Sequence, residues 1–255
     1  MCDSIGRTAP SLAHERGATA LIRPDVLQPS PMIAVVIDDM GLNEARSQRT
    51  IDLPGPLALS FLTYARDLPS WVARAHAAGH DVLAHLPMEP LDPSHDPGPD
   101  ALRVSMSPNE VRAAVAARLD GWSGYVGVNN HMGSRFCQDR PLMDAMMREL
   151  KSRGLFWLDS RTTERSVGIA AAKAAGVASL ERFMFLDVID DTDAVLRQLR
   201  RLERRGRWRG RTIGIGHPRE ATIRALAQWL PTLEHKRRVL VPITALLPRS
   251  SVTRR

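Results

Sequence analysis

The stretch Ile33-Ala34-Val35-Val36-Ile37-Asp38-Asp39-Met40-Gly41 decides the fold class. Its first five residues are apolar and mostly β-branched, with no polar residue between them. Such a run is typical of a strand that is buried on both faces, as in a parallel sheet. The run then ends in two carboxylates and a glycine. At the carboxyl end of a parallel strand, this pair is a candidate metal or proton-transfer site, and the alternative is a solvated turn that caps the next helix.

Strand-like and helix-like segments alternate along the rest of the chain. Further strands are predicted at 57–62, 81–86, 125–128 and 155–158, then one ending at 185–187, one at 211–216 and a final candidate at 239–243. The helix after Ser107 begins with a capping box that is closed by Glu110. This alternation indicates repeated βαβ units. We therefore predict an α/β fold, an irregular (β/α) barrel of about seven parallel strands.

Length and composition fit a single domain. The chain has 255 residues, of which 44% are hydrophobic and 25% are charged, which is enough for a full core. Residues 32–248 are expected to form the barrel, preceded by a flexible arm at 1–31 and followed by a frayed tail at 249–255. No apolar run approaches the ~18 residues that cross a bilayer. The polar start, residues 1–17, shows no signal-peptide core.

The charge and cysteine content exclude some classes of function. The net charge is +7, but aromatic residues make up only 5% of the chain. Because nucleic-acid surfaces interleave basic and aromatic side chains, nucleic-acid binding is not expected. Cys2 and Cys137 form neither a disulfide framework nor a metal knuckle, and Cys137 is expected to be a bystander.

Acids and histidines stand at the ends of most predicted strands. In chain order these are Asp38, Asp39, His85, Glu89, His131, Asp159, Asp187 and His217. Since parallel strands point the same way, their carboxyl ends should bring these side chains to one barrel mouth. The remaining histidines fall in arms, helices or loops and are expected to be solvated: His14, His76, His80, His95 and His235.

This set of side chains suits metal-assisted hydrolysis. One carboxylate and two imidazoles bind a divalent cation such as zinc and leave positions open for water. The cation lowers the pKa of that water towards ~7 and polarises the substrate carbonyl. A second carboxylate takes the proton, and a histidine opposite protonates the leaving amine. Further acids orient the histidines.

Five segments, taken together and in this order, resemble the divergent polysaccharide deacetylase family. They are Ile-Asp-Asp-Met-Gly at 37–41, His-Leu-Pro-Met-Glu-Pro at 85–90, Asn-Asn-His-Met-Gly-Ser at 129–134, Asp-Ser-Arg-Thr at 159–162 and Ile-Gly-Ile-Gly-His-Pro at 213–218. The resemblance covers about residues 32–245. It implies a deformed (β/α) barrel that uses a divalent metal, zinc in our prediction, to cleave the amide C–N bond of N-acetylated sugars.

The resemblance also implies roles for single residues. It makes Asp38 the general base, Asp39 a metal ligand and His217 the catalytic acid. Mainstream polysaccharide deacetylases carry two ligand histidines four residues apart, whereas His85 is followed at that interval by Glu89. We therefore predict that the ligands are Asp39, His85 and His131. The outer partners or alternative ligands are Glu89, Asp159 and Asp187, and substrate-binding residues are not identified.

The departure at Glu89 leaves other functions open. One is a non-catalytic envelope protein that keeps the barrel and binds a glycan or a partner. Another is a different metal-dependent barrel hydrolase, such as a phosphoesterase. Family members are usually exported, which suggests the periplasm or cell envelope, although no export or transmembrane segment is visible in this chain.

An arginine-rich stretch surrounds Trp208. The simplest interpretation is a solvated helix face and loop. The alternative is weak contact with an anionic envelope polymer or with phospholipid headgroups, through Arg200, Arg204, Arg207 and Arg209.

Overall fold

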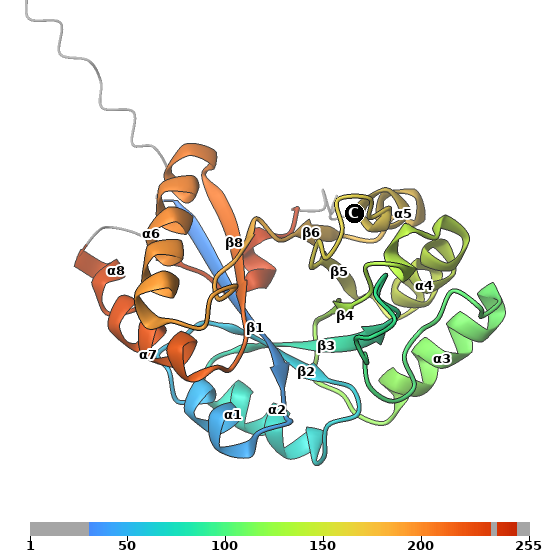
Figure 1. Cartoon of the computed structure of the whole chain (residues 1–255), viewed down its shortest axis with the longest axis horizontal. Coiled ribbons are helices and arrows are strands. Elements are labelled where there is room, and N and C mark those ends of the chain that lie inside the picture. The colour runs from blue at the N-terminus through green and yellow to red at the C-terminus, as the bar shows by residue number, and fades with distance from the viewer. Residues whose placement is uncertain (1–30, 236–238, 249–255) are drawn as a thin grey trace, which may run out of the picture.

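The computed structural model describes residues 31–235 and 239–248. One parallel sheet organises these residues, in the order β6-β5-β4-β3-β2-β1-β8-β7, and β9 pairs with β1. The strands are β1 (Met32–Met40), β2 (Ala58–Leu62), β3 (Asp81–Met88), β4 (Gly127–Met132), β5 (Phe156–Asp159), β6 (Ser179–Glu181), β7 (Met184–Phe185), β8 (Arg211–Gly216) and β9 (Val239–Leu240). The sheet curls into an open barrel (Figure 1), which confirms the predicted irregular (β/α) barrel.

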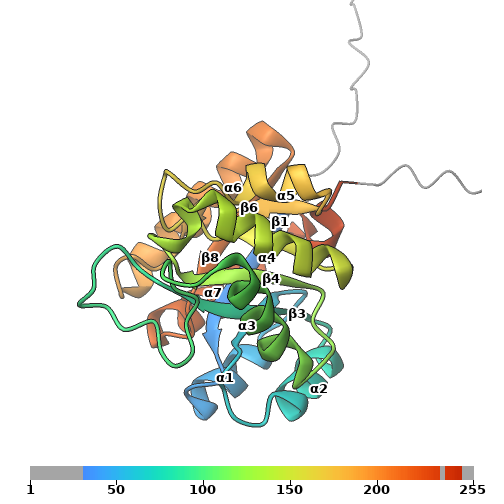
Figure 2. The same ribbon diagram turned by 90° about the vertical axis from the view of Figure 1, so that its right-hand side faces the viewer.

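Helices cover the outside of the curled sheet (Figures 1 and 2). They are α1 (Glu44–Ile51), α2 (Leu68–Ala77), α3 (Pro108–Asp120), α4 (Arg140–Ser152), α5 (Gly168–Ala175), α6 (Thr192–Arg209), α7 (Glu220–Trp229) and α8 (Thr232–His235). Two short 3₁₀ turns, η1 (Phe136–Gln138) and η2 (Ile243–Leu246), complete the secondary structure of the described residues. The capping box predicted at Ser107 and Glu110 is present at the start of α3.

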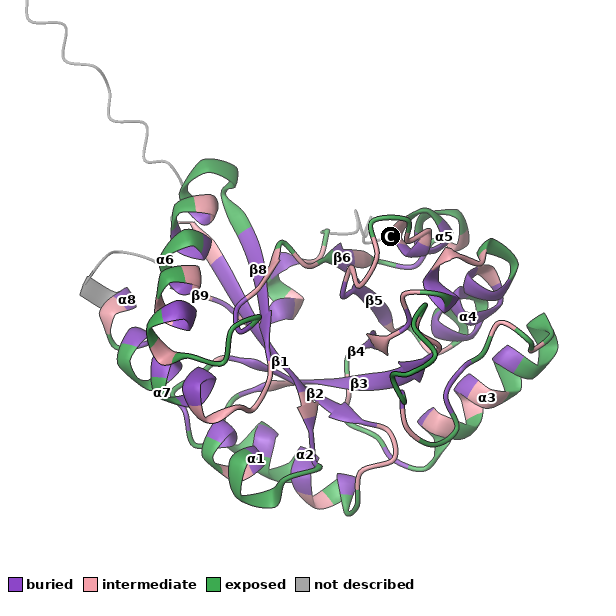
Figure 3. Cartoon of the chain, viewed as in Figure 1, coloured by how far each residue is buried: buried purple, intermediate pink, exposed green. Residues whose placement is uncertain are grey.

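The strands bury both of their faces, as the unbroken apolar run of β1 predicts. Ile33, Val35 and Ile37 belong to the core between the sheet and the helices. Ala34 and Val36 belong to a second cluster on the concave face, which also includes Ile243 and Leu246 of η2. Successive side chains of a strand point to opposite faces, so this alternation identifies the residues that line the barrel interior. Figure 3 shows the strands as almost entirely buried.

The segment expected to end the sixth strand forms two separate strands. β6 pairs with β5 at one edge of the sheet, and β7 pairs with β8 at the other. Only Arg182 and Phe183 separate them in the sequence. The chain therefore crosses between the two edges of the sheet, and within the described residues these edges are not paired with each other.

The expectation that His80 is solvated was wrong. His80 is only 3% exposed. Its Nδ1 accepts a hydrogen bond from the Leu57 amide at 3.1 Å, and its Nε2 donates to the Ile51 carbonyl at 2.8 Å. Both contacts come from segments distant in sequence, so the local pattern gave no sign of them. His76 and His95 are exposed as expected, whereas His14 and the side chain of His235 lie outside the described part of the chain.

The proposed arm at 1–31 and tail at 249–255 lie outside the described residues, apart from Pro31. Within the described ranges, no helix is both long and apolar enough to cross a membrane. Cys137 is buried, and burial raises the pKa of its thiol well above the usual value, which fits its expected bystander role.

Candidate functional site

The concave face of the barrel changes from apolar to polar towards the carboxyl ends of the strands. On β1 the inward positions are Ala34, Val36 and then Asp38. On β3 the inward positions are Leu83 and then His85. The same alternation places further polar side chains at the same level: Ser60, Asn129, Ser160 and His217. The polar layer lies directly above the apolar interior, which shields its lower side from water.

A β-bulge brings two adjacent carboxylates to this layer. The β1–β2 register passes from Ile37 opposite Leu59 to Met40 opposite Phe61, so β1 contains one extra residue. Asp39 takes a positive φ of 57° at this point. In a regular strand Asp39 would point away from the barrel interior, but a bulge redirects the side chain. Both Asp38 and Asp39 therefore face the mouth.

Asp39, His85 and His131 converge on one point. Oδ1 of Asp39 lies 2.8 Å from Nδ1 of His131 and 3.3 Å from Nε2 of His85. Among the described residues, these three form the group whose ligand atoms all lie within 4.8 Å of one another. The two imidazole rings meet edge to face, with centroids 5.1 Å apart.

The donor set fits a divalent cation. Oδ1 of Asp39 is buried and has no hydrogen-bond partner, although two imidazole nitrogens lie close to it. A buried carboxylate oxygen without a partner is costly, and a cation bound between the three atoms removes that cost. One carboxylate and two imidazoles are also a common ligand set for catalytic zinc, which keeps a further position open.

Asn129 connects the group of Asp39, His85 and His131, called the Asp39 centre from here on, to the surrounding strands. Its Nδ2 donates to Oδ1 of Asp38 at 2.8 Å and to Oγ of Ser160 at 3.2 Å. Its Oδ1 accepts from Nδ1 of His85 at 2.8 Å and from the Ser60 hydroxyl. The bond to Nδ1 fixes the His85 ring and leaves Nε2 for the centre, as outer partners of metal-binding histidines do.

The carboxylates and imidazoles shift one another's pKa. Burial raises the pKa of Asp38 above its usual value, even though His85, His217 and Asn129 act in the opposite direction. Burial alone would raise the pKa of Asp39 too, but its contacts with His131 and His85 hold it well below the usual range. The two adjacent acids therefore differ, because Asp39 is ionised more readily than Asp38.

A separate pair, His217 and Asp187, lies at the end of β8. Nδ1 of His217 donates to Oδ1 of Asp187 at 3.0 Å, and the His217 amide donates to Oδ2 at 2.7 Å. The Thr222 hydroxyl donates to the same Oδ2 at 2.8 Å. Burial would lower the pKa of His217, but the Asp187 carboxylate outweighs it and raises that pKa. The His217 ring is thereby fixed through Nδ1, and Nε2 makes no hydrogen bond to any other described residue.

Glu89 and Asp159 make contacts outside the group of three. Oε2 of Glu89 accepts from the Val104 amide at 2.7 Å, and its Oε1 pairs with Arg135 at 3.0 Å. These contacts hold the long loop that follows β3. Asp159 accepts from the Arg161 amide at 2.8 Å and from the hydroxyl of Ser166. The geometry therefore gathers Asp39, His85 and His131, with Asp38 beside them, and leaves these two acids to support loops.

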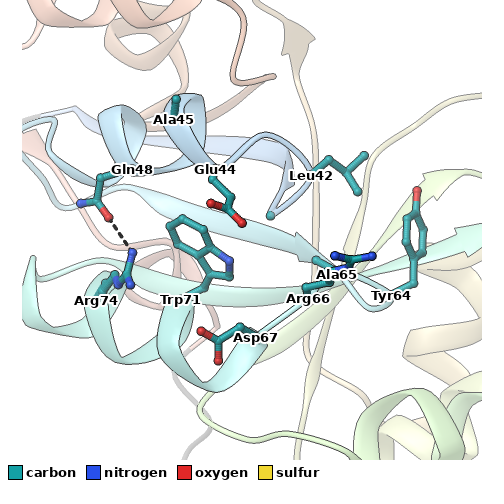
Figure 4. Close-up of a pocket in the computed structure, with 11 residues that line it drawn as sticks. Leu42, Glu44, Ala45, Gln48, Tyr64, Ala65, Arg66, Asp67, Trp71 and Arg74 are labelled. Carbon is teal, nitrogen blue, oxygen red and sulfur yellow. Dashed lines mark hydrogen bonds between the residues drawn. The ribbon is translucent and has the colours of Figure 1, made fainter.

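A pocket of about 810 Å³ opens between α1 and α2 (Figure 4). Gly41, two residues after Asp39, and Tyr64 belong to its lining. Burial and the charge of Asp39 raise the pKa of Tyr64. At the far end, Arg74 stacks over the Trp71 ring at 4.9 Å and is bonded to Gln48 at 3.2 Å.

Comparison with solved structures shows the class of fold to which the chain belongs. The described chain shares its fold with the Bc1960 peptidoglycan N-acetylglucosamine deacetylase, at a TM-score of 0.51 and 13% identity, over 86% of this chain and 88% of that one. A much closer match is the uncharacterized protein ATU2773 of Agrobacterium tumefaciens C58, at a TM-score of 0.83 and 29% identity, over 88% and 92% of the two chains. The protein is thus a polysaccharide-deacetylase-like barrel.

The sequence comparisons give the particular family. The model of the divergent polysaccharide deacetylases matches residues 35–247, so the chain belongs to that family. It is 33% identical over 202 residues to the uncharacterized protein YibQ of Escherichia coli K12. That match covers 79% of this chain but only 63% of YibQ, so the chain spans less than two thirds of that relative.

Sequence reasoning did not assign a role to Asn129, Ser60 or Ser160. All three are buried, and they are linked through the Asn129 side chain. Their signal was their position: each lies two residues beyond an inward-facing residue of its own strand. Reading the alternation on every strand would have selected them.

Proposed function

We propose that this protein is a metal-dependent hydrolase that removes acetyl groups from N-acetylated sugars by cleaving their amide C–N bond. The observation that carries the proposal is the convergence of Asp39, His85 and His131, with the carboxylate of Asp38 beside them. His85 Nε2 lies 3.7 Å from Oδ2 of Asp38, so the second carboxylate borders the same space. Membership of the family supports the carbohydrate substrate.

Asp39, His85 and His131 would hold the cation, and zinc suits their donor atoms. When bound, the ion supplies a Lewis acid that polarises the acetyl carbonyl and lowers the pKa of an attacking water. Asp38 accepts a proton from that water while the water oxygen bonds to the carbonyl carbon. Burial favours this role, because a raised pKa makes Asp38 a stronger base than an exposed carboxylate.

His217 completes the reaction as the acid. Its pKa is raised by Asp187, so it is protonated over a wider pH range than a free imidazole. Nε2 of His217 donates its proton to the amide nitrogen as the C–N bond breaks, and acetate and a free amine leave. Asp187 keeps the ring oriented throughout, since its carboxylate accepts hydrogen bonds from Nδ1 and from the main-chain amide of His217.

The pocket between α1 and α2 is our candidate for the sugar units next to the reacting acetyl group. It contains both aromatic and hydrogen-bonding side chains, including Tyr64, Trp71 and Gln48. Saccharides are bound by this combination of flat apolar surface and directed polar groups. Consistent with a glycan substrate, we propose that the protein acts in the periplasm or cell envelope.

Metal content and acetate release test this function together. The wild type should bind a divalent ion and release acetate from N-acetylglucosamine oligomers. His131→Ala should lose both properties, whereas His95→Ala should keep both, because the His95 side chain is 64% exposed and lies outside the group. Asp38→Asn should keep the metal and lose acetate release. A wild type without metal, or equal behaviour of the two histidine variants, would refute the proposal.

Glu89 favours a second candidate, a non-catalytic glycan- or partner-binding barrel of the envelope. Glu89 stands where mainstream enzymes have a second ligand histidine. Each of its carboxylate oxygens accepts a hydrogen bond, one from the Val104 amide and one from Arg135. This candidate predicts glycan binding that survives Asp38→Asn, without acetate release from any substrate. Measuring phosphate as well as acetate separates both from a metal-dependent phosphoesterase.

The outer face of α6 is our candidate for weak contact with an anionic polymer. Arg200, Arg204 and Arg207 are exposed there, and the neighbouring Trp208 is 89% exposed. Arg209, the fourth arginine predicted for this contact, is exposed too and also lines a second pocket. Binding to heparin at low salt, weakened by Arg200→Gln and Arg204→Gln, would support the contact.

A further inference from the structure

A second pocket lies at the seam where the barrel fails to close. It has a volume of about 550 Å³ and is bordered by β6, the β6–β7 connection, β8 and the last turns of α6. We call it the seam pocket. Its polar lining residues are Ser179, Glu181, Arg182, Arg205, Arg209, Arg211 and Thr212.

The seam pocket carries a strong positive charge. Arg182, Arg205, Arg209 and Arg211 face a single acid, Glu181. Glu181 is itself engaged by Arg161, at 3.7 Å. Within the described ranges, none of the four pocket arginines has a carboxylate within 4.0 Å. Arg182 and Arg211 donate to main-chain carbonyls, the latter to that of Leu246 at 3.1 Å, but carbonyls do not neutralise charge. Four guanidinium groups without a carboxylate partner repel one another, so an anion between them is stabilising.

Two of these guanidinium groups are held in place by aromatic rings. Arg182 lies over the Phe185 ring at 3.7 Å, and Arg205 lies over the Phe183 ring at 4.4 Å. Stacking uses the face of the guanidinium and leaves the N–H groups at its edge available. Arg182 is fixed further by bonds to the carbonyls of Ser160 and Arg161, at 2.6 and 2.7 Å.

We propose that the seam pocket binds the phosphate group of a phosphate monoester. A phosphate carries close to two negative charges and three terminal oxygens, and it therefore matches several guanidinium forks at once. A single carboxylate would leave most of the four charges uncompensated. The volume leaves room for the small group to which the phosphate is attached. The seam pocket shares no lining residue with the group of Asp39, His85 and His131, although Arg182 also bonds to the Ser160 carbonyl beside that group. The proposal does not depend on the proposed hydrolysis.

Calorimetric titration of the full chain at fixed ionic strength tests the site. The probes are glucose 1-phosphate, inorganic phosphate, neutral glucose and acetate. Glucose 1-phosphate should bind saturably and glucose should not. Vesicles that contain phosphatidic acid are a further probe, because this lipid headgroup presents the same monoester. Binding to the vesicles alone would identify a lipid headgroup as the ligand. Binding to glucose 1-phosphate would identify a soluble ester.

Paired variants separate the pocket from general charge. Arg205→Gln with Arg209→Gln should weaken glucose 1-phosphate binding by about tenfold or more, since each removes charge-assisted hydrogen bonds. Arg200→Gln with Arg204→Gln removes the same charge from the exposed face of α6 and should change the affinity less than about twofold. Equal losses in the two pairs, or no saturable binding by the wild type, would overturn the proposal.

Discussion

Asn129→Leu is the substitution that should most strongly separate the fold from the chemistry of the centre. The Asn129 side chain is fully buried and bonds to Asp38, His85, Ser160 and Ser60. Leucine has a similar volume and removes all of these bonds without opening a cavity. Four buried groups lose a bond, at about 1–3 kcal/mol each, and local relaxation recovers part of that total. We therefore expect a loss of about 3–6 kcal/mol.

Urea unfolding followed by circular dichroism measures this loss as a lower midpoint at constant slope. The matched control is Ser60→Ala, which removes one bond from the same Asn129 oxygen and should cost about 1 kcal/mol. Metal affinity is a second readout, because removing the partner of a metal-binding histidine typically weakens binding by about 10–100-fold. An Asn129→Leu protein no less stable than Ser60→Ala would refute the view that Asn129 holds the centre together.

Further predictions concern protons, metal and the loop. Asp187→Asn should shift the basic limb of the pH profile of kcat/KM to lower pH, because the carboxylate that raises the pKa of His217 is gone; an unchanged limb would exclude His217 as its source. Chelation should lower the Tm of the wild type by about 5–10 °C relative to protein at a free-metal concentration of 100 Kd, and it should leave the Tm of Asp39→Ala unchanged in a thermal scan. Burial lowers the pKa of His80 below its usual value, so His80 contributes stability above the unfolded pKa near 6.5 that is lost as the pH falls towards the lowered folded pKa. Replacing His80 with glutamine should remove the part of the fall in unfolding free energy that protonation of His80 causes. Urea midpoints measured between about pH 5 and 7 test this. Glu89→Gln should leave metal binding intact but speed proteolysis of the loop after β3, since its charged contact with Arg135 is lost; loss of metal instead would make Glu89 a ligand.

The barrel and the order of its elements could be predicted from the sequence because both depend on local patterns. Unbroken apolar runs such as the start of β1 identify strands buried on both faces, and capped periodic segments such as the one after Ser107 identify helices. The common direction of the strands then predicts that Asp38, His85 and His217 share a mouth. None of these steps needs a tertiary contact.

The edges of the sheet could not be predicted in this way. β6 and β7 are only three and two residues long, and they pair with strands at opposite ends of the sheet. A run that short has no periodicity of its own, so its partner depends on how far the whole sheet curls. The seam pocket exists because of that arrangement, and it gathers Arg182 with Arg205 from elements that the sequence does not place together.

The directions in which the acids point show where local patterns stop being sufficient. On β5 the alternation holds: Phe156 and Leu158 face inward, so Asp159 faces the helices and supports a loop. The same rule applied to β1 would send Asp39 away from Asp38. It fails there because the bulge inserts one residue relative to β2, and a bulge belongs to a pair of strands rather than to either one. The sequence of β1 shows two adjacent acids at the end of a buried strand, but it does not show that both face the mouth. That orientation depends on the register between β1 and β2.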